Sequence, residues 1–194
     1  IQAIRDGYIY IHDMSARRDT MNCCLFDVKS VLTGGFEMGN LWYNEPKTLD
    51  TAFDVIGDIV LSAASQQYGG FTVPSADDIL APYAQKSHEK YIKKYRELGL
   101  PEDVVQKVAW QDLEKEMEQG FQGWEYKFNS VSSSRGDYPF ITVTAGTNTT
   151  KYGKLATIKM LEVRRKGQGK AGHKKPVLFP KIVFLYDENL HGPG

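Results

Sequence analysis

This chain has few cysteines, no excess of charge of either sign and no long hydrophobic run. Two cysteines in 194 residues exclude a disulfide-rich secreted scaffold. The 24 basic and 24 acidic residues give a formal net charge of zero, whereas a general nucleic-acid-binding protein usually has a basic excess. No apolar segment approaches transmembrane length, and no basic-then-apolar signal segment opens the chain. The sequence therefore predicts a cytoplasmic protein with reduced thiols, no membrane contact and no direct binding of nucleic acid.

A metal site is not expected either. The cysteines are adjacent rather than in a C-x-x-C arrangement, which is the spacing typical of a metal site. The histidines are scattered along the chain and complete no ligand set: His12, His88, His173 and His191.

The adjacent pair Cys23-Cys24 is the most informative feature that is present. It lies in an apolar run, residues 21–28, that is bounded by polar residues and predicts a buried strand. Side chains alternate between the two faces of a strand, so the two thiols point in opposite directions and only one can face a given pocket. This arrangement favours thiol chemistry over a structural disulfide. The alternative is that both cysteines act as small, inert hydrophobic residues.

Apolar periodicity and turn signals predict an α/β fold with several long helices. Strands are expected at 7–12, 21–28, 138–144 and 177–185, and helices at 49–67, 75–98, 102–132 and 151–165. Ser75 is expected to be the N-cap of the second helix. The glycines of residues 33–40 predict a loop with a defined shape. Apolar strands joined by helical crossovers favour a parallel sheet with both faces covered. About three of the strands are good sheet strands, which is few for a complete sheet. The chain also begins without Met, so we expect residues 1–194 to be a single incomplete domain of a larger protein.

Residues 151–175 are locally basic and include the flexible segment 166–172, which is rich in glycine and lysine. Such a loop can hold phosphate through backbone N–H groups and positive charge. It lacks the Walker A pattern, and the alternative is a solvated helix face followed by a mobile loop.

Several separated motifs, in order along nearly the whole chain, together resemble the anaerobic (class III) ribonucleoside-triphosphate reductase family. The matching segments are Ile11-His12-Asp13, Asn22-Cys23-Cys24-Leu25 with Asp27, Gly35-Phe36, Gly39-Asn40, Pro46-Lys47, Ala64-Ser65-Gln66-Gln67-Tyr68-Gly69-Gly70, Leu80-Ala81-Pro82-Tyr83, Pro139-Phe140-Ile141-Thr142 and Phe179-Pro180-Lys181.

The resemblance implies a glycyl-radical enzyme built on a ten-stranded α/β barrel, of which this chain would be the N-terminal part. Such enzymes reduce the ribose 2′-hydroxyl of ribonucleoside triphosphates. The glycyl radical passes to a cysteine on a loop inside the barrel, and a second cysteine on the first barrel strand takes part in the reduction. Cys23 matches that strand cysteine, with Asn22 beside it, and Cys24 is then expected to face the barrel exterior and to pack against helices.

Other parts of the family pattern are absent from these residues. The sequence has no second separated cysteine, no glycyl-radical motif, no C-terminal zinc cysteines and no ATP-binding regulatory domain. We therefore expect no cofactor within these residues and no turnover by this chain alone. The resemblance implies that the parent enzyme uses a glycyl radical, ATP and dNTP effectors and a zinc site, forms a homodimer, and is activated by a radical-SAM enzyme.

The resemblance also implies a dNTP effector site at the dimer interface, which selects the base to be reduced. By position, His12, Lys47, Asp58 and Lys90 fall in the matching region. Lysine suits a polyphosphate as a mobile point charge, so Lys47 and Lys90 are the expected phosphate partners. The alternative is that both are ordinary surface charges.

Two other functions fit parts of the pattern. The chain could be a nucleotide-binding and dimerisation module without catalysis of its own, or a relative of the formate-lyase type of glycyl-radical enzyme. Radical generation would distinguish a reductase from a nucleotide-binding module. Deoxynucleotide binding would distinguish a reductase from a relative of the formate-lyase type.

Overall fold

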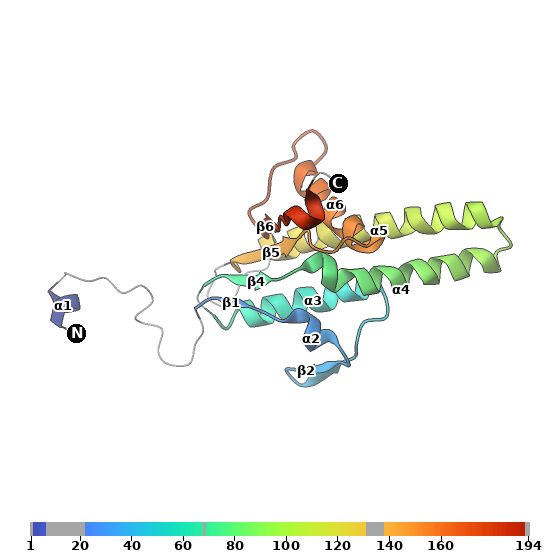
Figure 1. Cartoon of the computed structure of the whole chain (residues 1–194). Coiled ribbons are helices and arrows are strands. Elements are labelled where there is room, and N and C mark those ends of the chain that lie inside the picture. The colour runs from blue at the N-terminus through green and yellow to red at the C-terminus, as the bar shows by residue number, and fades with distance from the viewer. Residues whose placement is uncertain (1, 7–21, 68, 131–137, 193–194) are drawn as a thin grey trace.

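The computed structural model describes residues 2–6, 22–67, 69–130 and 138–192 (Figure 1). The strand expected at 7–12 lies outside the described residues, and so does His12.

Long helices form most of the described structure, and a small sheet lies beside them (Figure 1). The helices are α1 (Gln2–Arg5), α2 (Val28–Leu32), α3 (Leu49–Ala64), α4 (Ala76–Glu97), α5 (Glu102–Ser130), α6 (Lys151–Lys166) and α7 (Glu188–His191). The sheet strands are β1 (Cys24–Leu25), β4 (Phe71–Val73), β5 (Ile141–Ala145) and β6 (Lys181–Phe184), and a separate hairpin joins β2 (Phe36–Met38) to β3 (Leu41–Tyr43). The four long helices predicted from the sequence are thus confirmed, with ends that differ by only a few residues.

The sheet is parallel throughout and has the strand order β1-β4-β5-β6. Each step along it is a crossover that contains at least one helix, as parallel pairing requires. The described residues therefore hold four sheet strands where the sequence predicted about three. The strand that was missed is β4, which has only three residues between a glycine pair and Pro74.

Helices cover one face of this sheet. Along β4 and β5, residues that are almost fully buried alternate with partly exposed threonines. Residues that pair between neighbouring strands lie on the same face of the sheet. One face therefore carries the row Cys24, Phe71 and Ile141. The opposite face carries the row Leu25, Thr72, Thr142 and Lys181. The first row packs into the core, whereas Leu25 is 77% exposed. The prediction that both faces are covered is thus wrong for the described residues, and we call the second face the open face.

The core behind the sheet is formed by α3, α4, α5 and α6. Phe53 of α3 meets Phe121 and Trp124 of α5 edge-on, with ring centroids 5.0 and 4.9 Å apart. The indole of Trp124 donates a hydrogen bond to the Phe53 carbonyl at 2.9 Å. Gly120 makes this contact possible because a Cβ there would overlap the Phe53 ring.

The cysteine segment differs from its prediction. Among the described residues its strand is two residues long and lies at the edge of the sheet, so the expected buried strand is wrong over 22–28. Residue 21 lies outside the described part of the chain. The strand ends because Asp27 caps α2, where its Oδ1 accepts a hydrogen bond from the Ser30 backbone N–H at 3.1 Å.

Two further local predictions need correction. The glycine-rich loop at 33–40 is partly the β2–β3 hairpin, with Gly39 at a positive φ of 63° in its turn. Ser75 does occupy the N-cap position of α4, but its side chain makes no capping hydrogen bond, and its backbone N–H instead donates to Thr144 Oγ1 on β5 at 2.8 Å.

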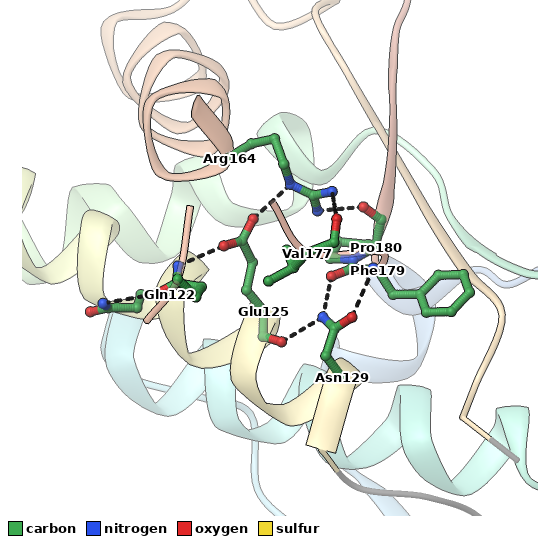
Figure 2. Close-up of polar contacts among 8 residues, drawn as sticks. Gln122, Glu125, Asn129, Arg164, Val177, Phe179 and Pro180 are labelled. Carbon is green, nitrogen blue, oxygen red and sulfur yellow. Dashed lines mark hydrogen bonds and ion pairs between the residues drawn. The ribbon is translucent and has the colours of Figure 1, made fainter. Parts of the chain in front are cut away.

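A buried ion pair joins α5 to α6. Glu125 is 4% exposed, and its Oε1 accepts a hydrogen bond from Arg164 Nε at 2.7 Å (Figure 2). Its Oε2 accepts from Gln168 Nε2 at 2.6 Å. Both carboxylate oxygens are thus paired, as a buried charge requires.

The same arginine holds the segment that leads into β6. Arg164 donates to the carbonyls of Val177 and Pro180, and Asn129 of α5 both donates to and accepts from the backbone of Phe179 (Figure 2). Segment 177–180 has no regular secondary structure of its own, so these side chains satisfy its backbone groups and fix its path.

We predict that Glu125→Gln lowers the free energy of unfolding by about 2 kcal/mol, because it weakens a hydrogen bond between charged groups in a buried site. Urea denaturation measures the change. The matched control is Glu118→Gln, which removes the surface ion pair of Glu118 with Lys166 and should change stability by less than about 1 kcal/mol. Equal effects of the two substitutions would contradict a special role for the buried pair.

Candidate functional site

Cys23 lies immediately before β1 and is exposed. Its Sγ accepts a hydrogen bond from the Gly70 backbone N–H at 3.2 Å. The preceding residue, Asn22, accepts at its carbonyl from the Gly69 N–H at 2.5 Å. The two glycines that follow α3 therefore hold the thiol in place through main-chain contacts.

The glycine at 69 is required for space. A Cβ at this position would overlap Cys23 Sγ and both oxygens of Asn22. Two motifs that lie more than forty residues apart, Asn22-Cys23 and Gly69-Gly70, thus meet at the edge of the sheet. The sequence predicted the thiol but not this contact, since a glycine pair after a helix first indicates a C-cap.

Cys24 points to the opposite side, toward the helices. Its Sγ donates to Gln67 Oε1 at 3.1 Å, and Gln67 Nε2 donates to the Gly69 carbonyl at 3.2 Å. Cys24 also lines a cavity of about 520 Å³ between the β2–β3 hairpin and α3. Burial, together with the neighbouring Cys23, raises the pKa of the Cys24 thiol, which disfavours its reactive thiolate form. The expected orientation of Cys24 against helices agrees with these contacts.

The residues proposed for an effector site are not brought together by any contact among the described part of the chain. Lys47 lies exposed just before α3, and Lys90 lies exposed near the middle of α4. Asp58 on α3 pairs with Lys127 of α5 at 3.3 Å, so its charge is balanced within the chain. His12 lies outside the described residues. The effector role of all four residues therefore stays a prediction.

Metal-ligand groups and a buried histidine are the other features of the described residues that bear on chemistry. No group of three or more His, Cys, Asp or Glu side chains that could hold a metal ion occurs among them. His88 is buried between helices, where its Nδ1 lies 3.0 Å from the Tyr152 hydroxyl, and burial lowers its pKa. None of the helices in the described ranges is long and apolar enough to span a membrane.

Comparison with known proteins gives the family. The family model described as anaerobic ribonucleoside-triphosphate reductase matches residues 1–192. The chain belongs to this family. The resemblance seen in the separated motifs is thereby confirmed.

Curated relatives agree over nearly the whole chain. The anaerobic ribonucleoside-triphosphate reductase of Haemophilus influenzae is 37% identical over 193 residues, which are 98% of this chain and 27% of the relative. The enzyme of that name from phage T4 is 33% identical over 98% of this chain and 31% of its own length. The Escherichia coli enzyme is 35% identical over 98% of this chain and 26% of its own length. The chain thus spans less than a third of the length of these relatives.

Solved structures support the fold class. A crystal structure of the anaerobic ribonucleotide reductase from Thermotoga maritima with citrate in the active site matches with a TM-score of 0.58 and 18% identity, over 84% of this chain and 28% of that one. A second structure of that enzyme, in complex with dATP and CTP, matches with a TM-score of 0.57 and 20% identity over 74% and 21%. The predicted helix-rich α/β fold with a parallel sheet is therefore confirmed.

We predict that Gly69→Ala destabilises the fold by about 1–3 kcal/mol, because the new methyl group must displace Asn22 and Cys23. Gly123→Ala is the matched control: it lies within α5 with no atom within 4 Å of the added Cβ, so it should stabilise by about 0.5–1 kcal/mol. Thermal or urea denaturation compares the two variants. A neutral Gly69→Ala would show that the close approach of the two motifs is not tight.

We predict that a small thiol reagent modifies Cys23 faster than Cys24. Cys23 is exposed, whereas the pKa of Cys24 is raised and its Sγ is bonded to Gln67. Mass spectrometry of the modified chain, with Cys23→Ser and Cys24→Ser as reference variants, gives the two rates. Faster labelling of Cys24 would reverse the assignment of the two thiols.

Proposed function

We propose that this chain forms part of the catalytic unit of an enzyme that reduces ribonucleoside triphosphates to 2′-deoxyribonucleoside triphosphates, and that Cys23 is its strand cysteine. The observation that carries this proposal is the position of the Cys23 thiol, exposed at the sheet edge and held by the Gly70 N–H. Membership of the reductase family supports the choice of reaction.

The role of Cys23 is to supply reducing equivalents beside the ribose. Replacing the 2′-hydroxyl by hydrogen, with loss of water, takes two electrons and two protons. The Cys23 thiol gives one hydrogen atom and becomes a thiyl radical, and an external two-electron reductant, formate or a thiol protein, supplies the balance and restores the thiol. Cys24 does not suit this role, since its Sγ donates to Gln67 on the other side of the strand. Asn22 flanks the reactive thiol and is itself exposed, so its amide is available to a bound nucleotide.

The radical that starts the reaction needs further groups. The family resemblance implies a glycyl radical, a second cysteine that carries a thiyl radical, a zinc site and a radical-SAM activating enzyme. Cys24 is the other thiol of these 194 residues, and its hydrogen bond to Gln67 on the helix side argues against a role as radical carrier. We assign these groups to the parent enzyme and only Cys23 to this part of it.

We also propose a dNTP effector site at a homodimer interface. A structure of the Thermotoga maritima enzyme has dATP bound in its specificity site, which supports an effector site in the family. On this chain, Lys47 and Lys90 are exposed cations that could meet its phosphates. Asp58 already pairs with Lys127, so at the effector site its negative charge would be neutralised by that lysine.

Substitution of each cysteine in the full-length enzyme tests the catalytic role. Cys23→Ser should abolish deoxynucleotide formation and leave dNTP binding unchanged, because serine cannot give up hydrogen as a thiol does. Cys24→Ser keeps a donor for Gln67 and should retain most of the activity. Product chromatography and calorimetric titration with dNTPs provide the two readouts. Reduction by the Cys23→Ser enzyme would remove the catalytic role and leave a nucleotide-binding module as the better description.

A further inference from the structure

The four strands of the sheet contain a single charged residue, Lys181, the first residue of β6. The register pairs Lys181 with Thr142, which pairs with Thr72 and then with Leu25. Lys181 therefore lies on the open face. Strand alternation places Cys23 on this face as well, since Cys24 points toward the helices.

Lys181 has no acidic partner among the residues that the structure describes. Some lysines of the described residues, such as Lys29, Lys86 and Lys166, pair with carboxylates. The Lys181 ammonium makes no ion pair within the described ranges and lies over the ring of Phe140, 4.0 Å from its centroid. This contact directs the charge along the sheet toward β4 and β1 and leaves its hydrogen-bond donors available for a ligand.

Phe140 links this cation to the thiol. Its ring lies over Gly70, where an added Cβ would be 3.3 Å from the ring. The N–H of the same Gly70 donates to Cys23 Sγ. Lys181, the Phe140 ring, Gly70 and Cys23 thus follow one another across the open face. Adjacent strands lie about 4.8 Å apart, so the backbones of β1 and β6 are separated by about 14 Å, and the lysine side chain reaches back over part of that span.

The position of Lys181 is fixed from behind. Arg164 binds the carbonyl of Pro180, the residue just before Lys181, and Asn129 binds the backbone of Phe179 (Figure 2). The Phe179 ring also meets the Phe140 ring at a centroid distance of 5.4 Å. An exposed lysine on such an anchored segment is better ordered than one on a mobile loop, which lowers the entropy lost on binding.

We propose that Lys181 binds the phosphate groups of the ribonucleotide whose ribose faces Cys23. This inference rests on the proposed reductase function. Lys181 is a cation with no acidic partner in the described ranges, on a strand face whose other side chains are threonine, aliphatic and aromatic. Such a cation is suited to the polyanionic end of a nucleotide. The sheet then binds its substrate at two points, the phosphates near β6 and the sugar near β1.

The test uses the full-length enzyme with its effector site saturated. Calorimetry measures binding of a ribonucleoside triphosphate and of the matching unphosphorylated nucleoside to the wild-type, Lys181→Met and Lys181→Arg forms. Lys174→Met, which removes another exposed lysine from the loop before β6, is the matched control.

We expect Lys181→Met to weaken triphosphate binding by about ten- to a hundred-fold, the effect of losing one hydrogen bond between charged groups. Nucleoside binding should be unchanged, Lys181→Arg should restore part of the affinity, and KM should rise more than kcat falls. Lys174→Met should have no effect. Unchanged triphosphate affinity in Lys181→Met, or equal weakening of triphosphate and nucleoside, would overturn the proposal. The second of these results would mean that the lysine supports the sheet rather than the phosphates.

The same experiment separates this inference from the function on which it rests. If Cys23→Ser abolishes turnover while Lys181→Met binds triphosphate normally, the reductase function stands and the phosphate site is wrong. If Cys23→Ser leaves turnover intact while triphosphate affinity depends on Lys181, the phosphate site stands and the role of Cys23 is wrong.

Discussion

The arrangement of helices on one face of a parallel sheet is the constraint on which the rest of the structure depends. It divides β4 and β5 into residues that pack into the core, such as Phe71 and Ile141, and residues that remain open, such as Thr72 and Thr142. It also gives two neighbouring cysteines different chemistry. The helix side surrounds Cys24 with apolar groups and Gln67 and raises its pKa, whereas Cys23 stays exposed.

The sequence predicted the elements whose signals are local and repeated. Helices α3, α4, α5 and α6 each have several turns of apolar periodicity, so their existence and their approximate ends could be predicted. β4 and the β2–β3 hairpin have three-residue strands, which are too short for alternation to be recognised. The edge position of β1 could not be predicted either, because exposure of a short apolar strand depends on which neighbours pair with it.

The candidate site shows the same division. Alternation along the chain is a local property, and it predicted that the two thiols point apart. The contacts that hold them are tertiary, since Gly69 and Gly70, which follow α3, contact Cys23. No local pattern indicates that a glycine pair after a helix also contacts a thiol far away in the sequence. The pairing of Asp58 with Lys127 is likewise tertiary, and it changes an apparently free acid into half of an ion pair.

The buried ion pair of Glu125 and Arg164 connects this architecture to the open face. Burying two charges stabilises little by itself, and its net contribution is often near zero. Here the pair also orients Arg164 so that its remaining donors reach the carbonyls of Val177 and Pro180, which have no partner in a helix or sheet. The main effect of the ion pair is therefore to position residues 177–180. It holds this irregular segment against α5 and α6, and so sets where β6 begins. Because β6 begins with Lys181, a contact in the core determines where the single charge of the sheet lies relative to Cys23.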